Sequence, residues 1–245
     1  MTSSPHTLFL PGMMCDERLF APQVAPQVAT TDARTERQCV AFDAHDSIEA
    51  MAATTLAHAA DEPVVLVGLS MGGIVAMECL RQQPDRVHAI VLIDTNHLAE
   101  SPERREARVP QIARALAGEL DTVLIDEMKP LYLAPSNRHD EALLALVLDM
   151  ARTLGPEVFA AQSKALAARR DYTAVLAAWR GPALLLCGEH DALCPPSRHR
   201  DMQALMPQAE LVVIPDAGHL PTLETPRTLG PLLERFLEHV GTGAL

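Results

Sequence analysis

The sequence has few aromatic residues, few lysines and no long hydrophobic run. Aromatic residues make up 3% of the 245 positions, so a pocket built on ring stacking is not expected. The net charge is −12 at pH 7, whereas nucleic acid and anionic membrane surfaces bind clustered basic side chains. The longest stretch without a charge, Pro63 to Met77, is too short to span a membrane. We therefore expect neither a nucleic-acid partner nor a membrane partner.

Cysteine is also scarce, and its five positions are far apart. They form no Cys-x-x-Cys pair and no cluster with histidine, so the sequence predicts free thiols and no metal site. Residues 1–6 contain neither a basic region nor an apolar run, so no signal peptide is expected there. Together these features predict a cytoplasmic protein. The cysteines are Cys15, Cys39, Cys79, Cys187 and Cys194.

Short apolar runs alternate with helical patterns along most of the chain. A hydrophobic fraction of 48% is ample for a buried core. The alternation is typical of βαβ units and predicts a parallel sheet with helices on both faces. We expect strands at residues 7–10, 38–42, 63–67, 87–94, 183–187 and 211–214. Helices of this layer are expected at residues 17–29, 47–60, 71–83, 198–206 and 225–239.

The pattern changes between residues 96 and 179, where no convincing strand occurs. The segment instead shows helical patterns, and Gly155-Pro156 predicts the end of one helix and the start of the next. We expect residues 1–95 and 180–245 to form one α/β core, with 96–179 inserted after its fourth strand as a helical cap. The expected cap helices span residues 103–117, 120–128, 140–153 and 156–168.

Ser70 occupies the centre of a Gly-x-Ser-x-Gly motif, at Gly68 to Gly72. An apolar strand pattern precedes the motif and a helical pattern follows it, which is the context that gives the motif meaning. The turn must be so tight that small residues flank the serine two positions away on each side. A serine held in this way is exposed beside a helix N-terminus, so the pattern predicts a nucleophile.

A serine nucleophile needs a base and an acid that orients the base. Asp191 follows the fifth predicted strand in Gly-Glu-His-Asp, and His219 follows the sixth in Gly-His-Leu-Pro. Ligands of parallel sheets bind at the carboxyl ends of the strands, so Ser70, Asp191 and His219 are expected to converge. Asp94, at the end of the fourth predicted strand, is the alternative acid.

These three motifs, in this order and spacing, resemble those of the α/β-hydrolase family. The chain is most similar to its small capped group of carboxylesterases, enol-lactonases, C–C hydrolases and cofactor-free haloperoxidases. The resemblance implies a mostly parallel sheet of about six strands, because the two strands that usually come first are absent. It also implies that Ser70 is the nucleophile, His219 the base and Asp191 the acid, with Asp94 as the other candidate.

The resemblance further implies an oxyanion hole made of two backbone N–H groups. One belongs to Met71, the residue after the nucleophile. The other is expected from Met13, in the loop after the first strand. Relatives often carry His-Gly in this loop, where this chain has Pro11-Gly12, so the chain departs from the family pattern next to Met13.

The substrate pocket is expected to be aliphatic, with methionine as an adaptable wall. We expect Met14, His97 and Leu220 to line it. Arg105 and Arg108 in the cap are weak candidates for a group that binds a carboxylate, because solvated helix faces explain them, and no lysine or arginine occupies a position that stands out for this role. Two of the cysteines, Cys15 and Cys194, fall near the predicted site and are interpreted as pocket lining or inert thiols.

These features predict a serine hydrolase that cleaves small carboxylic esters through an acyl-enzyme. No metal or organic cofactor is required by such chemistry. The expected partner is a small-molecule ester or lactone, and the expected assembly is a monomer or homodimer. The alternatives are a lactonase, a C–C hydrolase or a perhydrolase with the same three residues, or a non-catalytic ligand receptor on the same fold.

Overall fold

A single six-stranded sheet forms the centre of the molecule, with the strand order β2-β1-β3-β4-β5-β6. The computed structural model describes residues 5–24, 37–43, 45–60, 62–128 and 131–241. Every strand pairing is parallel, which confirms the predicted α/β fold class. The strands are β1 (His6–Leu10), β2 (Arg37–Cys39), β3 (Val64–Leu69), β4 (Val87–Ile93), β5 (Ala183–Gly188) and β6 (Glu210–Ile214).

The central strands are apolar on both faces because helices cover both sides of the sheet. All residues of β3 and β5 are buried. Among the described residues, the edge strand β2 pairs with β1 only, and it ends at Cys39, three residues earlier than predicted. The predicted helix 17–29 is represented by short turns, η1 (Glu17–Phe20) and α1 (Ala21–Val24), and its last residues lie outside the described ranges.

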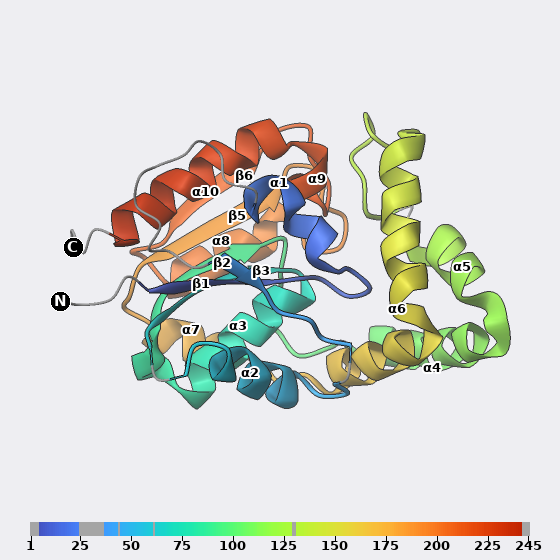
Figure 1. Cartoon of the computed structure of the whole chain (residues 1–245), viewed down its shortest axis with the longest axis horizontal. Helices are drawn as coiled ribbons and strands as arrows, with labels where there is room; N and C mark the ends of the chain where they lie inside the picture. The colour runs from blue at the N-terminus through green and yellow to red at the C-terminus, as the bar shows by residue number, and fades with distance from the viewer. Residues whose placement is uncertain (1–4, 25–36, 44, 61, 129–130, 242–245) are drawn as a thin grey trace.

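Two layers of helices sandwich the sheet (Figure 1). One hydrophobic cluster joins one face of the sheet to helices α2, α3, α7 and α8, and a second joins the other face to α1 and α10. The bounds of these helices, and of the short helix α9 that precedes α10, are α2 (Ile48–Ala57), α3 (Met71–Gln82), α7 (Thr173–Ala178), α8 (Pro196–Leu205), α9 (Pro221–Glu224) and α10 (Pro226–Gly241). Among the described residues, no helix is both long enough and apolar enough to cross a membrane.

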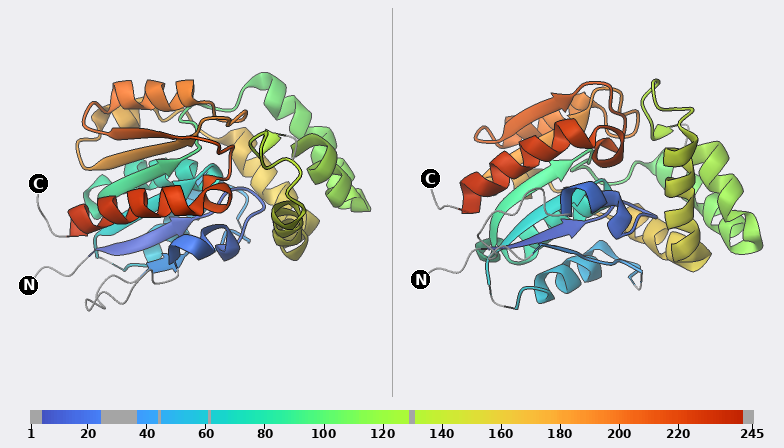
Figure 2. Two further views of the ribbon diagram at one scale, coloured as in Figure 1. Left: turned by 90° about the horizontal axis from the view of Figure 1, so that it is seen from above. Right: turned by 45° about the horizontal axis from the view of Figure 1, so that its top comes forward.

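Most of the helices inserted between β4 and β5 lie beyond the carboxyl ends of the strands (Figures 1 and 2). They are α4 (Pro102–Arg114), α5 (Leu120–Val123) and α6 (Glu141–Ala168), with π-helical turns at Ala115–Glu119 and Leu124–Met128. Gly155 has φ 85° and is followed by Pro156, so α6 consists of two helical halves that meet at a kink, where the sequence predicts a break. Helix α7, which the sequence pattern does not predict, contacts α3 and α8 of the core.

Candidate active site

Ser70 stands in a strained turn between β3 and α3, with φ 55° and ψ −113°. The flanking glycines are required because the backbone is too crowded for side chains. A Cβ atom on Gly72 would lie 1.9 Å from the carbonyl oxygen of Leu10, and one on Gly68 would lie 2.4 Å from that of Gly72. The turn therefore packs directly onto its neighbours and presents the serine side chain at the sheet edge.

Hydrogen bonds from the neighbouring strand fix this turn. The Ser70 N–H donates to the carbonyl oxygen of Ile93 at 2.9 Å, and the Thr95 hydroxyl donates to the carbonyl oxygen of Ser70 at 2.7 Å. Both partners lie at or just beyond the end of β4. A strained residue persists only where its surroundings hold it, and these two contacts supply that restraint.

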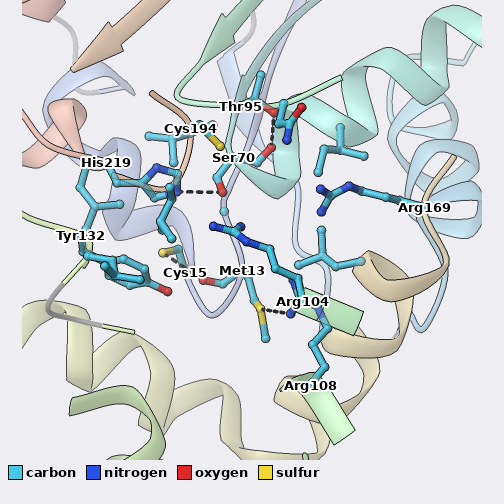
Figure 3. Close-up of a pocket in the computed structure, with 18 of the residues that line it drawn as sticks. Met13, Cys15, Ser70, Thr95, Arg104, Arg108, Tyr132, Arg169, Cys194 and His219 are labelled. Atoms are coloured by element: carbon cyan, nitrogen blue, oxygen red, sulfur yellow. Dashed lines mark hydrogen bonds between the residues drawn. The ribbon is translucent and has the colours of Figure 1, made fainter. Parts of the chain in front are cut away.

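A chain of two hydrogen bonds links Ser70, His219 and Asp191, and Figure 3 shows the bond between Ser70 and His219. His219 Nε2 lies 2.9 Å from Ser70 Oγ, and His219 Nδ1 lies 2.9 Å from Asp191 Oδ2. A carboxylate can only accept, so Nδ1 carries the proton and Nε2 is left as an acceptor for the serine hydroxyl. The structure thus brings together the three residues that the sequence predicted to converge.

Asp191 is held by the loop after β5 as well as by the histidine. Its Oδ1 accepts the N–H groups of Leu193 at 2.8 Å and Cys194 at 3.0 Å. Burial would raise the pKa of Asp191, but the charge and hydrogen bond of His219 hold that pKa well below its usual range. The carboxylate is therefore ionised and fixed in orientation.

Hydrogen bonds to the side chain of Glu224 hold the loop that carries His219. Glu224 Oε1 accepts the N–H groups of Gly218 and Leu220, which flank the histidine, and Glu224 Oε2 accepts that of Ala134 from the inserted segment. The His219 N–H in turn donates to the carbonyl oxygen of Tyr132 at 2.7 Å. These bonds join the histidine loop to the insertion.

Asp94 lies beside this system but does not contact the histidine through any hydrogen bond in the described part of the chain. It is fully buried and its Oδ1 accepts the Gly188 N–H at 2.9 Å. Burial, followed by the negative charge of Asp191, raises the pKa of Asp94 well above its usual value. Of the two candidate acids, Asp191 is the one paired with His219, whereas burial favours the neutral form of Asp94.

We expect the stability of the protein to depend on pH through the buried side chain of His199. It is fully buried beneath Thr95, and burial lowers its pKa to about 4. The unfolded chain takes up a proton near pH 6.5, so the contribution of neutral His199 is present above that pH and is lost as the pH falls toward 4. We expect the free energy of unfolding to drop by about 2 kcal/mol between pH 7 and pH 5 from this group.

Urea denaturation of the wild type and of His199→Gln at both pH values measures this contribution. Asp94 changes the free energy of unfolding in the opposite direction as the pH falls, because its pKa is raised on folding. The contribution of His199 is therefore the difference between the losses of stability of the two proteins. Equal losses of stability in both proteins would show that His199 is not the titrating group.

The two N–H groups predicted to form an oxyanion hole are not occupied by other acceptors in the described part of the chain. Met71 is the first residue of α3, where helical N–H groups have no partner within the helix. Met13 follows Gly12 in the loop after β1, and Gly12 lies against Ser70. Met71 directly follows the serine, and Met13 lines the same cavity as Ser70.

A cavity of about 210 Å³ opens beside Ser70 and His219. Leu220 lines it, as predicted, but two other predicted pocket residues lie elsewhere. Met14 has φ 58°, its N–H donates to Gln162 Oε1, and its side chain packs into the core. His97 is buried away from the cavity wall, where its carbonyl oxygen accepts the Tyr172 N–H.

Three arginines on the cavity wall were not predicted from the sequence as a group: Arg104 and Arg108 from α4, and Arg169 from the end of α6. The guanidinium of Arg104 points toward Ser70 (Figure 3). A helix rich in exposed arginine gives no local signal for which side chain will face a cavity. Only the docking of α4 over the sheet edge distinguishes Arg104 from Arg105.

Cys15 and Cys194 both line the cavity, and neither is a reactive thiol. Burial raises the pKa of Cys15 to about 12 and that of Cys194 well above its usual value. Possible ligand atoms of Asp191, Cys194 and His219 lie within 4.8 Å of one another. Both Asp191 oxygens already accept N–H donors, and a neutral thiol is a poor ligand, so hydrogen bonding explains this cluster without a metal.

Comparisons with known proteins show the family to which this chain belongs. The model of the alpha/beta hydrolase fold family matches residues 26–226. A pimeloyl-[acyl-carrier protein] methyl ester esterase of Aromatoleum aromaticum is 31% identical over 77% of this chain and 79% of its own length. An esterase of Thermogutta terrifontis, solved with malate bound, is 29% identical with a TM-score of 0.85, over 98% of this chain and 92% of its own.

The enol-lactonase of Burkholderia xenovorans has a similar fold, with a TM-score of 0.80 over 96% of this chain and 92% of its own, at 22% identity. The family match covers most of the chain. It includes the strained serine turn and the loops that carry Asp191 and His219. By sequence and by fold, this chain therefore belongs to the α/β-hydrolase family.

Proposed function

We propose that the protein is a serine hydrolase that cleaves small carboxylic esters through an acyl-enzyme. The observation that carries the proposal is the continuous hydrogen-bond chain from Ser70 Oγ through His219 to Asp191, with both links at 2.9 Å. Related esterases of similar length support the ester as the bond that is cleaved.

In the first half of the reaction, Ser70 attacks the ester carbonyl carbon while His219 Nε2 takes the hydroxyl proton. The carbonyl oxygen becomes negative and is stabilised by the N–H groups of Met71 and Met13. Asp191 stabilises the imidazolium that forms and keeps the ring in the productive orientation. The intermediate then collapses, and His219 returns the proton to the departing alcohol.

In the second half, water enters the place of the alcohol. His219 removes a proton from the water, which attacks the acyl carbon, and the acid product leaves as Ser70 recovers its proton. The burial of Asp191 and the fixed His219 loop keep the proton path intact through both halves. A cavity of about 210 Å³ suits a small acyl or alcohol group.

Active-site labelling tests this proposal. A fluorophosphonate should add covalently to Ser70, and mass spectrometry of the digested protein should find the adduct on the peptide containing Gly68 to Gly72. Short p-nitrophenyl esters should release a burst of one nitrophenol per protein if deacylation is slower than acylation. A protein that binds ligands without catalysis would give neither the adduct nor turnover.

The outcome also separates the ester from its alternatives. A labelled Ser70 with slow ester turnover and fast turnover of lactones would keep the serine mechanism but contradict the preference for open-chain esters. No adduct on Ser70, or an adduct on another residue, would contradict the mechanism itself.

A further inference from the structure

The cavity wall formed by α4 and α6 carries an unusual excess of positive charge for a chain whose net charge is −12. Arg104, Arg108 and Arg169 line this wall, and Glu127 also contributes to it. Two of these arginines are largely buried, with side chains of Arg108 and Arg169 exposed by 14% and 6%. Buried charges are costly unless they are paired, so their partners decide what the cavity can bind.

Arg108 and Arg169 share one carboxylate. The Arg108 guanidinium contacts Glu100 Oε2 at 2.8 Å, and Arg169 Nη1 lies 3.2 Å from Glu100 Oε1. Arg169 also donates to the carbonyl oxygen of Leu98 at 2.9 Å. The Glu100 side chain is fully buried. One carboxylate balances two guanidinium groups only in part, so this cluster keeps one positive charge.

Glu127 does not supply the missing negative charge. Its two oxygens already bind Arg114 and the side-chain amide of Gln111. Arg114 also pairs with Glu119, so it balances the charge of Glu127 only in part, but no ion pair joins Glu127 to the three cavity arginines among the described residues.

Arg104 adds a second positive charge to the cavity wall. No carboxylate pairs with its guanidinium in the part of the chain that the structure describes, and Figure 3 shows it extending into the cavity toward Ser70. Its charge acts inside the site: burial is the main cause of the lowered pKa of Arg169, and the positive charge of Arg104 adds to it. An anion bound to Arg104 would also relieve its repulsion of Arg169.

We infer that Arg104 binds a carboxylate carried by the substrate, so that the preferred esters are monoesters of short dicarboxylic acids. This inference rests on the proposed serine hydrolase function and adds the substrate class. A guanidinium presents a planar pair of N–H donors that match a carboxylate, and such charge-assisted pairs are stronger than neutral hydrogen bonds. The volume of the cavity limits the spacer between ester and carboxylate to a few methylenes.

The test compares two esters of the same length. Monomethyl glutarate and methyl valerate differ in that a methyl group replaces the carboxylate, and the methanol released from either can be assayed with alcohol oxidase. The wild type is expected to prefer monomethyl glutarate in kcat/KM. Monomethyl succinate and monomethyl adipate extend the comparison to a shorter and a longer spacer.

Arg104→Gln is expected to lower the ratio of kcat/KM for monomethyl glutarate over methyl valerate by about 10- to 100-fold, which corresponds to the loss of one charged hydrogen-bonding partner. The change should appear mainly in KM for the anionic ester. Arg105→Gln is the matched control, because Arg105 is exposed on the same helix and does not line the cavity. It should leave the ratio unchanged. A ratio that is unchanged in Arg104→Gln would overturn the inference.

Binding separates this inference from the proposed mechanism. Calorimetry should show monomethyl glutarate binding to Ser70→Ala, with at least tenfold weaker binding to Ser70→Ala/Arg104→Gln. That result supports the carboxylate site even if Ser70 proves not to be the nucleophile. Equal affinity of the two variants, or a wild-type preference for methyl valerate, would overturn the carboxylate site while leaving the serine mechanism intact.

Discussion

Ser70→Ala is expected to lower kcat for p-nitrophenyl esters by about 10⁵- to 10⁶-fold, since it removes the atom that attacks the carbonyl carbon. The substitution keeps the Cβ atom, so the strained turn and the helix that follows it should remain in place. His219 would lose its partner at Nε2 but keep its bond to Asp191. Residual turnover would come from the oxyanion donors and substrate positioning alone.

Steady-state kinetics and fluorophosphonate labelling measure this effect in parallel. Ser197→Ala provides the control, because Ser197 is an exposed serine on α8 outside the cavity. It should retain wild-type activity and labelling. Turnover by Ser70→Ala within tenfold of the wild type, in protein with unchanged circular dichroism, would exclude Ser70 as the nucleophile.

Asp191→Asn is expected to lower kcat/KM by about 10⁴-fold with little change in the fold. Asparagine can present an NH₂ group to His219 Nδ1, which then becomes an acceptor and moves the ring proton to Nε2. A protonated Nε2 cannot take the proton of Ser70. The loop should keep its shape because the asparagine carbonyl can still accept the N–H groups of Leu193 and Cys194.

Asp94→Asn is the matched comparison for this second prediction. Burial and the charge of Asp191 favour the neutral form of Asp94, and an uncharged amide of the same shape keeps an acceptor for the Gly188 N–H. We expect its kcat/KM to fall by less than about tenfold, the effect of losing one neutral hydrogen bond at most. A mild effect of Asp191→Asn with a severe effect of Asp94→Asn would reverse the assignment of the acid.

Most of the fold could be predicted from the sequence, because strands and helices leave patterns among neighbouring residues. A strand buried on both faces must be apolar throughout, as β3 and β5 are, and each such run ends where helical spacing begins. Gly155-Pro156 predicted the kink in α6 since glycine accepts φ 85° and proline cannot continue the hydrogen-bond ladder. The short elements α7 and α9 were missed because one or two turns carry too little periodicity.

The pocket was the part that local patterns predicted least well. Met14 lies next to Met13 in the sequence, but its positive φ turns its side chain into the core. Arg104 and Arg105 are adjacent on α4, and nothing in their surroundings in the sequence separates them. Which one faces the cavity depends on how α4 packs over the sheet, a property of the tertiary structure.

The sequence by itself determined the fold and the tight serine turn of this protein, because glycine spacing and strand-to-helix alternation are properties of neighbouring residues. It left two candidates for the acid that orients His219, since Asp94 and Asp191 both follow strands that end at the same sheet edge. Only the tertiary structure paired His219 with Asp191 and turned Arg104 toward Ser70. Both outcomes depend on distances between segments far apart in the chain, which residue spacing does not encode.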